Sequence, residues 1–250
     1  MRVEEIPAYE QNFHDTGIDS QGKRHILSHR QIPIPGETIS MNYTLVQPAS
    51  GKASYYYQQE FPKKQIVLHY TMGYLKGDIA TLTAPDEYVS VPFVIARNGT
   101  IYNLFSSRFW SFHLGLGAIG GNEIRSKATI GIELSNIGHL TQTSEGMKSW
   151  RNVIYCDVSQ IQFYEQRAFQ GHRYFATFTA AQYQSLLILL RYLTAQYNIA
   201  REFLPDDFRY LAFEEVIDFN GIVSHVNYRS TGKLDIGPAF DWERIIAGMR

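Results

Sequence analysis

Two stretches of the chain have the hydrophobic patterns of buried β-strands. Residues 65–70 form a short apolar run that ends in a histidine and a tyrosine, which is typical of a strand covered on both faces. Residues 129–135 alternate, because every second residue of a strand faces the same side. One face would carry Ile130, Ile132 and Leu134, and the other Thr129, Gly131, Glu133 and Ser135.

A hairpin and a further strand are predicted nearby. The apolar runs 93–97 and 100–104 flank Asn98-Gly99. This dipeptide is typical of two-residue hairpin turns, because both residues tolerate a positive φ. Residues 38–46 alternate more weakly and are consistent with another strand.

The spacing of apolar residues also predicts three helices. Thr179 and Gln182 form a capping box. The helix that follows would have about five turns and end near Asn198. Its apolar positions are Tyr183, Leu186, Leu187, Leu190, Leu193 and Tyr197. A short helix is predicted to begin with Asp78 as its N-cap and to end before Pro85, and another follows Trp242.

Strands that alternate with helices predict an α/β fold with a mixed central β-sheet flanked by helices. Residues 63–250 would form this main domain. Residues 1–62 differ from the rest in their residue pattern and contain a Pro- and Gly-rich break at 32–36. They are expected to be an extension wrapped on the main domain or a small cap. Residues 138–178 fit no clear pattern and are interpreted as a long aromatic-rich insertion.

Composition narrows the choice of function classes. The 250 residues are 44 % apolar and 19 % charged, with a formal charge of −1, so no field attracts nucleic acid or an acidic membrane surface. No apolar run is long enough to insert into a membrane. The start of the chain lacks a signal-peptide pattern, which favours a cytoplasmic location, with release or secretion to the cell wall as the alternative. The single Cys156 excludes an intrachain disulfide and is expected to be an inert, partly buried thiol.

Three residues far apart in the sequence are candidate metal ligands. His69 ends the first predicted strand, His225 follows an apolar tripeptide, and Asp235 lies in a turn bounded by Gly and Pro. Two imidazoles and a carboxylate can occupy three corners of a zinc tetrahedron and leave the fourth open for water. Each residue also has an ordinary alternative: a satisfied polar group at a strand end for the histidines, and an Asx-turn for Asp235.

Two further charged residues accompany this set. Glu133 projects from a strand whose neighbours are apolar or small, where an ionised carboxylate needs a partner. Lys233, two residues before Asp235, could supply a cation beside the water or could be solvated.

From His69 to Asp235 the chain resembles the zinc-dependent N-acetylmuramoyl-L-alanine amidases of the type-2 amidase superfamily. That superfamily also contains T7-type phage lysozyme and the peptidoglycan recognition proteins. The resemblance covers about two-thirds of the chain in ordered blocks. These include Leu68 to Gly73, Phe93 to Tyr102, Trp110 with His113-Leu114-Gly115, Ser126 to Asn136, Tyr174 to Tyr183, and the terminal block from His225 to Trp242.

The resemblance implies a fold, a cofactor and a set of roles. His69, His225 and Asp235 would ligate one Zn²⁺ per chain, Glu133 would act as general base, and Lys233 would stabilise the oxyanion. The substrate would be peptidoglycan or a muropeptide, cleaved between the lactyl group of N-acetylmuramic acid and L-alanine. Trp110 and His113 would lie at the substrate cleft, with core packing as the alternative for Trp110.

The resemblance is incomplete in one catalytic position. T7-type lysozyme carries a catalytic tyrosine where this chain has Val91-Pro92, so the work of proton transfer shifts to Glu133. Two other functional hypotheses stay open: a peptidoglycan-binding module without catalysis, and a zinc amidase that acts on a different amide.

The other histidines fit none of these blocks. His139 and His172 are expected to be solvated loop residues. His14, His25 and His29 could make a second metal site, although their spacing forms no strong motif.

Overall fold

The predicted strands meet in one mixed sheet of seven strands, whose order is β1-β2-β5-β4-β6-β3-β12. The computed structural model describes all 250 residues. β4, β6, β3 and β12 run parallel to one another in this order, with β12 at one edge, whereas β4-β5 and β1-β2 are antiparallel hairpins. The strands are β1 (His25–Pro33), β2 (Ser40–Pro48), β3 (Gln65–Tyr70), β4 (Phe93–Ile95), β5 (Ile101–Asn103), β6 (Thr129–Leu134) and β12 (Gly221–Ser224).

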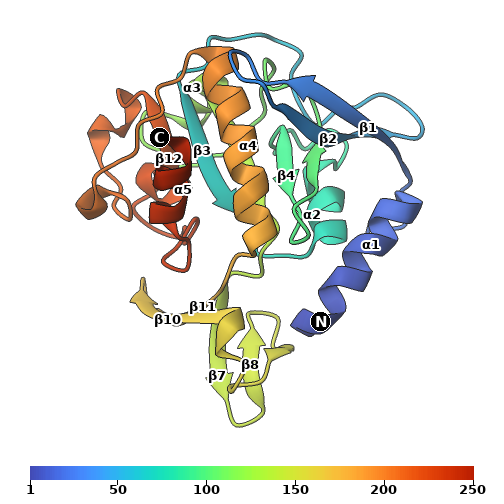
Figure 1. The fold of residues 1–250 in the computed structure, drawn as a ribbon, viewed down its shortest axis with the longest axis vertical. Coiled ribbons are helices and arrows are strands. Elements are labelled where there is room, and N and C mark those ends of the chain that lie inside the picture. Colours follow the sequence, from blue (N-terminus) through green and yellow to red (C-terminus); the bar gives the residue numbers. More distant parts are fainter.

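Helices cover both faces of this sheet, as the sequence predicts. The helices are α1 (Ile6–Thr16), α2 (Leu75–Leu82), α3 (Asn122–Ala128), α4 (Ala180–Tyr197) and α5 (Trp242–Met249). One core cluster joins Ile66, Leu68, Ile130 and Ile132 of the sheet to α4 and α5. A second joins Val94 and Tyr102 to α1 and α2 on the opposite face. Figure 1 shows α4 crossing the sheet in front of β3. No helix combines the length and hydrophobicity needed to cross a bilayer.

Most predicted elements are confirmed, with one wrong helix start. The capping box of α4 is present at Thr179 and Gln182, and Asn198 ends the helix in the left-handed conformation. Asp78 is not an N-cap, because α2 begins three residues earlier, after Tyr74. The Asp78 side chain instead turns into the core, where Ser135 Oγ donates to Asp78 Oδ2 at 2.6 Å. Burial raises the pKa of Asp78 to about 7.

Residues 1–62 contribute strands to the main sheet. β1 and β2 form a nine-residue antiparallel ladder, and β2 continues the sheet through a parallel pairing with β5. The weak alternation at 38–46 therefore marks β2, whereas β1 has no comparable signal in the sequence.

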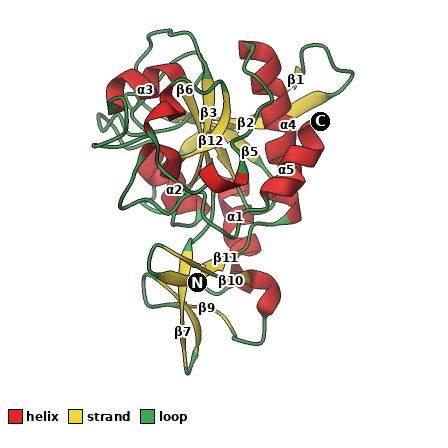
Figure 2. Cartoon of the chain, turned by 90° about the vertical axis from the view of Figure 1, so that its left-hand side faces the viewer, coloured by secondary structure: helices red, strands yellow, loops and turns green.

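The stretch from 138 to 178 forms a second sheet of five strands, in the order β10-β11-β7-β8-β9. Its strands are β7 (His139–Thr143), β8 (Gly146–Ser149), β9 (Ile154–Cys156), β10 (Tyr164–Phe169) and β11 (His172–Ala176). Figure 2 shows this small sheet below the body formed by the main sheet and its helices. Val3 and Ile6 from the start of the chain pack into its core beside Leu140. Cys156 lies in the same cluster, where burial raises its pKa to about 11, as expected for an inert thiol.

Candidate metal centre

The register of three parallel strands brings predicted site residues together where the carboxyl ends of these strands meet, at one edge of the main sheet. His69 of β3 lies directly beside Glu133 of β6. On the other side of β3, Ser224 of β12 pairs with Leu68, so His225, the next residue, continues beside His69. Strand polarity thus gathers two histidines and a carboxylate that are up to 156 residues apart in the chain.

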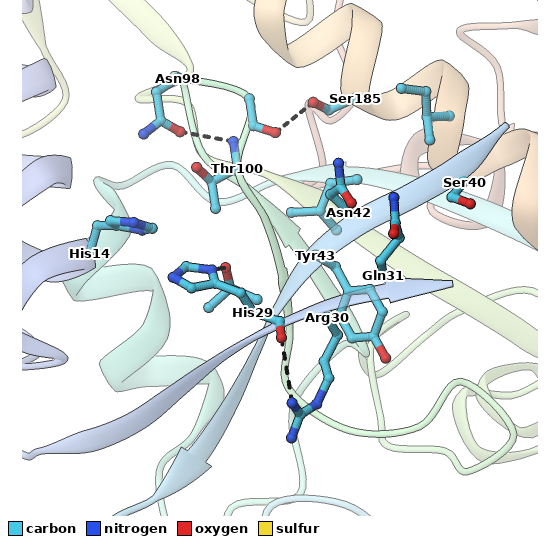
Figure 3. A pocket seen from close by; sticks show the side chains of 14 residues that line it. His14, His29, Arg30, Gln31, Ser40, Asn42, Tyr43, Asn98, Thr100 and Ser185 are labelled. Carbon is cyan, nitrogen blue, oxygen red and sulfur yellow. Dashed lines mark hydrogen bonds between the residues drawn. The ribbon is translucent and has the colours of Figure 1, made fainter. Parts of the chain in front are cut away.

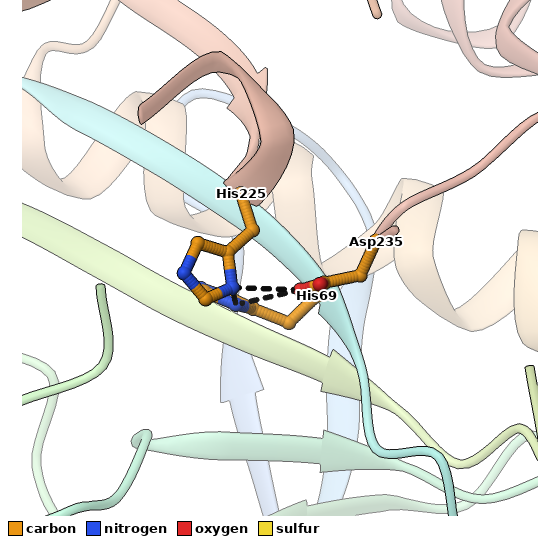
Figure 4. Close-up of side chains that lie close together, drawn as sticks. All are labelled: His69, His225 and Asp235. Carbon is orange, nitrogen blue, oxygen red and sulfur yellow. Dashed lines mark hydrogen bonds and ion pairs between the residues drawn. The ribbon is translucent and has the colours of Figure 1, made fainter. Parts of the chain in front are cut away.

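Asp235 completes the group from the loop that follows His225. The backbone N–H of Val226 donates to Asp235 O at 2.9 Å and ties the loop back on itself. Asp235 Oδ2 lies 2.8 Å from His225 Nδ1 and 3.2 Å from His69 Nδ1, and the two Nδ1 atoms are 2.9 Å apart. Figure 4 shows the three side chains converging. All three side chains are buried: His69 is 1 % exposed, His225 2 % and Asp235 7 %.

Hydrogen bonds on the far side of each ring fix where the lone pairs point. His225 Nε2 lies 2.9 Å from Leu114 O, which can only accept, so Nε2 carries the proton of the neutral ring. His225 Nδ1 is then a lone pair that faces Asp235.

His69 is oriented by a longer chain of the same kind. The Thr129 hydroxyl donates to Arg125 O at 2.8 Å and so accepts from His113 Nε2, also at 2.8 Å. His113 Nδ1 then accepts from His69 Nε2 at 3.1 Å. His69 Nδ1 is therefore also a lone pair. Outer partners of this type are what orient histidine ligands in metal sites.

Three electron-rich atoms consequently face one another with no proton between them. Such an arrangement is repulsive in a protein interior unless a cation lies at its centre. A tetrahedral zinc with bonds of ~2.0–2.1 Å would separate its ligand atoms by about 3.4 Å, so the observed spacings of 2.8–3.2 Å would have to widen slightly to admit it. This is the only group of three or more His, Cys, Asp and Glu side chains in the structure with ligand atoms within 4.8 Å. These residues could hold a metal ion, and the donor set fits zinc.

The electrostatics of the group agree with a ligand role. Burial, with a smaller contribution from His225, lowers the pKa of His69 to about 4, so its ring is neutral at pH 7. A neutral imidazole and an ionised carboxylate are the forms that bind metals.

Glu133 and Lys233 line the same cleft, which has a volume of about 530 Å³. Burial and the nearby Asp235 raise the pKa of Glu133 well above its usual value, and its Oε2 has no hydrogen-bond partner. Lys233 forms no ion pair with any acidic side chain. Both groups are thus free to act on a molecule in the cleft.

Of the two predicted substrate-binding residues, His113 lines the cleft and Trp110 does not. His113 lines the cleft, but both of its ring nitrogens are bonded within the protein, to His69 and Thr129. It sits over Gly131, where a β-carbon would come within 3.1 Å of His113 Nδ1. Trp110 is 4 % exposed and does not line the cleft. It stacks on Tyr57 at 4.3 Å, so core packing, the alternative for this residue, describes its position.

The remaining histidines require one correction. His139 and His172 are not solvated loop residues: they lie on β7 and β11, partly buried, with ring centroids 3.9 Å apart. His172 and Gln170 from the small sheet line the metal cleft. No sequence pattern indicates this placement, because residues 138–173 match no family block.

A larger hollow of about 640 Å³ lies away from this cleft, between α1, β1, β2 and α4. Figure 3 shows His14 and His29 among its amide and hydroxyl side chains. Their ring centroids are 5.1 Å apart, and His29 Nδ1 is paired with Thr44 Oγ1. His25 instead pairs with the buried Asp19. The three histidines do not form a second metal group.

Fold and site together define a mixed α/β domain in which three buried side chains at the carboxyl ends of the central strands could hold a metal ion. The chain belongs to the N-acetylmuramoyl-L-alanine amidase family, whose model matches residues 59–238. It is 30 % identical over 196 residues to N-acetylmuramoyl-L-alanine amidase AmiD of Escherichia coli K12, covering 75 % of this chain and 54 % of that relative. The chain thus spans about half the length of this curated relative.

A solved structure has a similar fold. The E. coli AmiD complex with the substrate anhydro-N-acetylmuramic acid-L-Ala-D-γ-Glu-L-Lys superposes with a TM-score of 0.50 at 23 % identity. The match covers 87 % of this chain and 65 % of that one. The likeness supports the mixed α/β fold expected from the sequence.

Proposed function

We propose that this protein is a zinc-dependent amide hydrolase. The bond cleaved is the amide between the lactyl group of N-acetylmuramic acid and L-alanine, in peptidoglycan or its soluble fragments. The observation that carries the proposal is the convergence of the His69, His225 and Asp235 lone pairs inside a cleft that also holds an unpaired carboxyl group. Family membership and the muropeptide bound to the E. coli relative support the choice of amide.

His69 Nδ1, His225 Nδ1 and Asp235 Oδ2 are assigned as the protein ligands of one zinc ion. Bound zinc would lower the pKa of water to about 7 and polarise the scissile carbonyl. The contribution of the chain itself is to hold the two histidine ligand atoms in place through Leu114 and His113 and the Asp235 loop through Val226.

Glu133 is assigned as the general base. Its register beside His69 puts the carboxyl group at the metal edge, and its raised pKa suits a group that must accept a proton and then release it. The carboxylate takes a proton from the attacking water and passes it to the nitrogen of the leaving L-alanine.

Lys233 is assigned to the carbonyl oxygen of the substrate. An ammonium group without an acidic partner can donate to the negative charge that develops on this oxygen as water attacks. Donors aimed at such a charge accelerate acyl transfer because they require no reorganisation during the reaction.

One assay separates this proposal from the other two functions. The purified protein is analysed for zinc and incubated with anhydro-N-acetylmuramic acid-L-Ala-D-γ-Glu-L-Lys. We expect about one zinc per chain and release of a peptide with a free L-alanine amino group. A non-catalytic binder retains the substrate without cleaving it, and a hydrolase for another amide binds zinc but leaves this substrate intact.

A second assay distinguishes the physical form of the substrate. Intact sacculi and soluble anhydro-muropeptides are supplied at equal concentrations of the scissile amide. The faster reaction identifies whether the cleft, with the small sheet as one wall, accepts polymer or fragments.

A further inference from the structure

A second hollow adjoins the metal cleft across a rim formed by Gln170 and Gly232. Both residues line both hollows, so the two spaces meet there. Gly232 belongs to the loop between the ligands His225 and Asp235, and Gln170 lies in the turn from β10 to β11. The second hollow has a volume of about 630 Å³, comparable to that of the metal cleft.

The rim is held in place by an aromatic contact. Phe169, next to Gln170, meets the ring of Tyr210 edge-on with centroids 5.8 Å apart. The guanidinium of Arg167, also on β10, lies 5.5 Å from the centroid of the same tyrosine ring. The small sheet is thereby joined to the body of the protein where the two hollows meet.

Arg229 is the only charged residue that lines the second hollow. The other walls are apolar, such as Leu211 and Val226, or carry hydroxyl groups, such as Ser230 and Thr231. Arg229 Nη1 donates one long hydrogen bond to Leu114 O at 3.4 Å, and the side chain forms no ion pair. A guanidinium has five N–H donors; Nη1 also packs closely against Gly115, and the other donors have no partner within the protein.

The charge distribution of the proposed substrate decides which part can lie there. The lactyl carboxyl of N-acetylmuramic acid is consumed in the scissile amide, so the sugar side is uncharged. A γ-linked D-glutamate in the second peptide position keeps a free α-carboxylate, the anion nearest to the cleaved bond. Arginine binds carboxylates with two parallel hydrogen bonds, which gives both affinity and orientation.

We propose that Arg229 and the hollow around it form a subsite for the α-carboxylate of D-γ-glutamate. The stem peptide then runs from the metal cleft over the Gln170–Gly232 rim. The sugar is then left to the rest of the cleft, whose lining includes Val89 and Phe112. This assignment rests on the proposed function and adds to it the direction in which the substrate lies.

The test compares two substrates that differ in one group. One is anhydro-N-acetylmuramic acid-L-Ala-D-γ-Glu-L-Lys, and the other carries an amide in place of the glutamate α-carboxylate. Arg229→Gln is expected to lower kcat/KM about tenfold for the acid, mainly through KM, and less than about twofold for the amide. Arg229→Lys retains the charge and should restore part of the preference for the acid.

Arg30→Gln is the matched control, because Arg30 likewise makes a single long bond to a backbone carbonyl, 3.5 Å from His29 O, but lies at the remote hollow. It should leave both substrates unaffected. Equal discrimination between acid and amide by the parental protein and Arg229→Gln overturns the subsite. Should the glutamine variant fail to fold, Arg229→Met, which also removes the charge, replaces it and is judged by the same ratio.

Failure of the proposed function is recognised separately. If the parental protein releases no peptide from either substrate, the hydrolase proposal falls, and binding of the same two molecules is measured by calorimetry. Acid binding weakened about tenfold by Arg229→Gln, with amide binding unchanged, still supports the subsite. Binding that is equal for both proteins contradicts it.

Discussion

The two sheets of this molecule hold their histidines in different ways. At the edge of the main sheet, His69 and His225 are buried, and a hydrogen bond on the far side of each ring fixes its orientation. In the small sheet, His139 and His172 face each other with ring centroids 3.9 Å apart, and His139 Nδ1 has no partner. The neighbouring strand β10 is largely exposed.

This difference separates two tasks. Catalysis needs atoms held to within a fraction of an ångström, which buried parallel strands and outer hydrogen bonds provide. A cleft wall needs only shape and a few contacts, which a small exposed sheet can supply. Changes at the main-sheet edge should therefore alter metal binding and turnover, and changes in the small sheet should alter substrate binding alone.

The largest effect is expected from Asp235→Ala. Loss of a direct ligand should weaken zinc binding by well over the ~100-fold that loss of an outer partner causes, and activity should disappear with the metal. Zinc content after dialysis and peptide release measure both. Asp157→Ala, which changes an exposed acid on the small sheet, is the control and should bind zinc normally. Retention of a full equivalent of zinc by Asp235→Ala would contradict the ligand assignment.

Glu133→Ala should separate turnover from metal binding. Removing the general base is expected to lower kcat by about 10²–10⁴-fold, while zinc content and thermal stability stay at parental values. Single-turnover kinetics and metal analysis test this on one preparation. Hydrolysis at the parental rate shows that the base is another group.

His113→Phe tests the orienting chain behind His69. The substitution leaves His69 Nε2 without its acceptor, so zinc affinity should fall by ~10–100-fold, measured by chelator competition. Thr129→Val acts one bond farther away and should have a smaller effect in the same direction. If the metal-free variant unfolds at a lower temperature but its zinc affinity is unchanged, His113 serves packing alone.

The smallest effect is expected from His172→Ala in the small sheet. Loss of one contact in the cleft wall should raise KM by only a fewfold, equivalent to about 1 kcal/mol, and leave kcat and zinc content unchanged. His139→Ala is the matched control, because His139 packs against His172 but does not line the cleft. A large fall in kcat for His172→Ala would erase the distinction between the two sheets.

The local hydrophobic pattern predicted the main-sheet strands well where the strands are buried, because burial requires apolar side chains. The run at 65–70 and the alternation at 129–135 became β3 and β6, and the capping box became the start of α4. Asp78 shows the limit of such signals. An aspartate before an apolar stretch suits an N-cap, yet here its carboxyl group meets Ser135, which follows β6 and lies 57 residues further along the chain.

The small sheet could not be predicted because its strands are short and mostly half-exposed, so few of them carry a clear hydrophobic period. The burial of β10, for example, is intermediate only at its two ends. The contact of His172 with the metal cleft depends on how this sheet docks, which no local pattern encodes.

The sequence by itself determined which residues could carry the chemistry, because ligand and acid–base properties belong to the side chains of His69, His225, Asp235, Glu133 and Lys233. It also determined the central strands, through their apolar period. Only the tertiary structure decided which nitrogen of each imidazole faces the centre, since that choice depends on Leu114 O and on the chain through His113 and Thr129. It alone also placed Gln170 and Gly232 together as the rim between two hollows, because contacts between distant segments form only when the sheets pack.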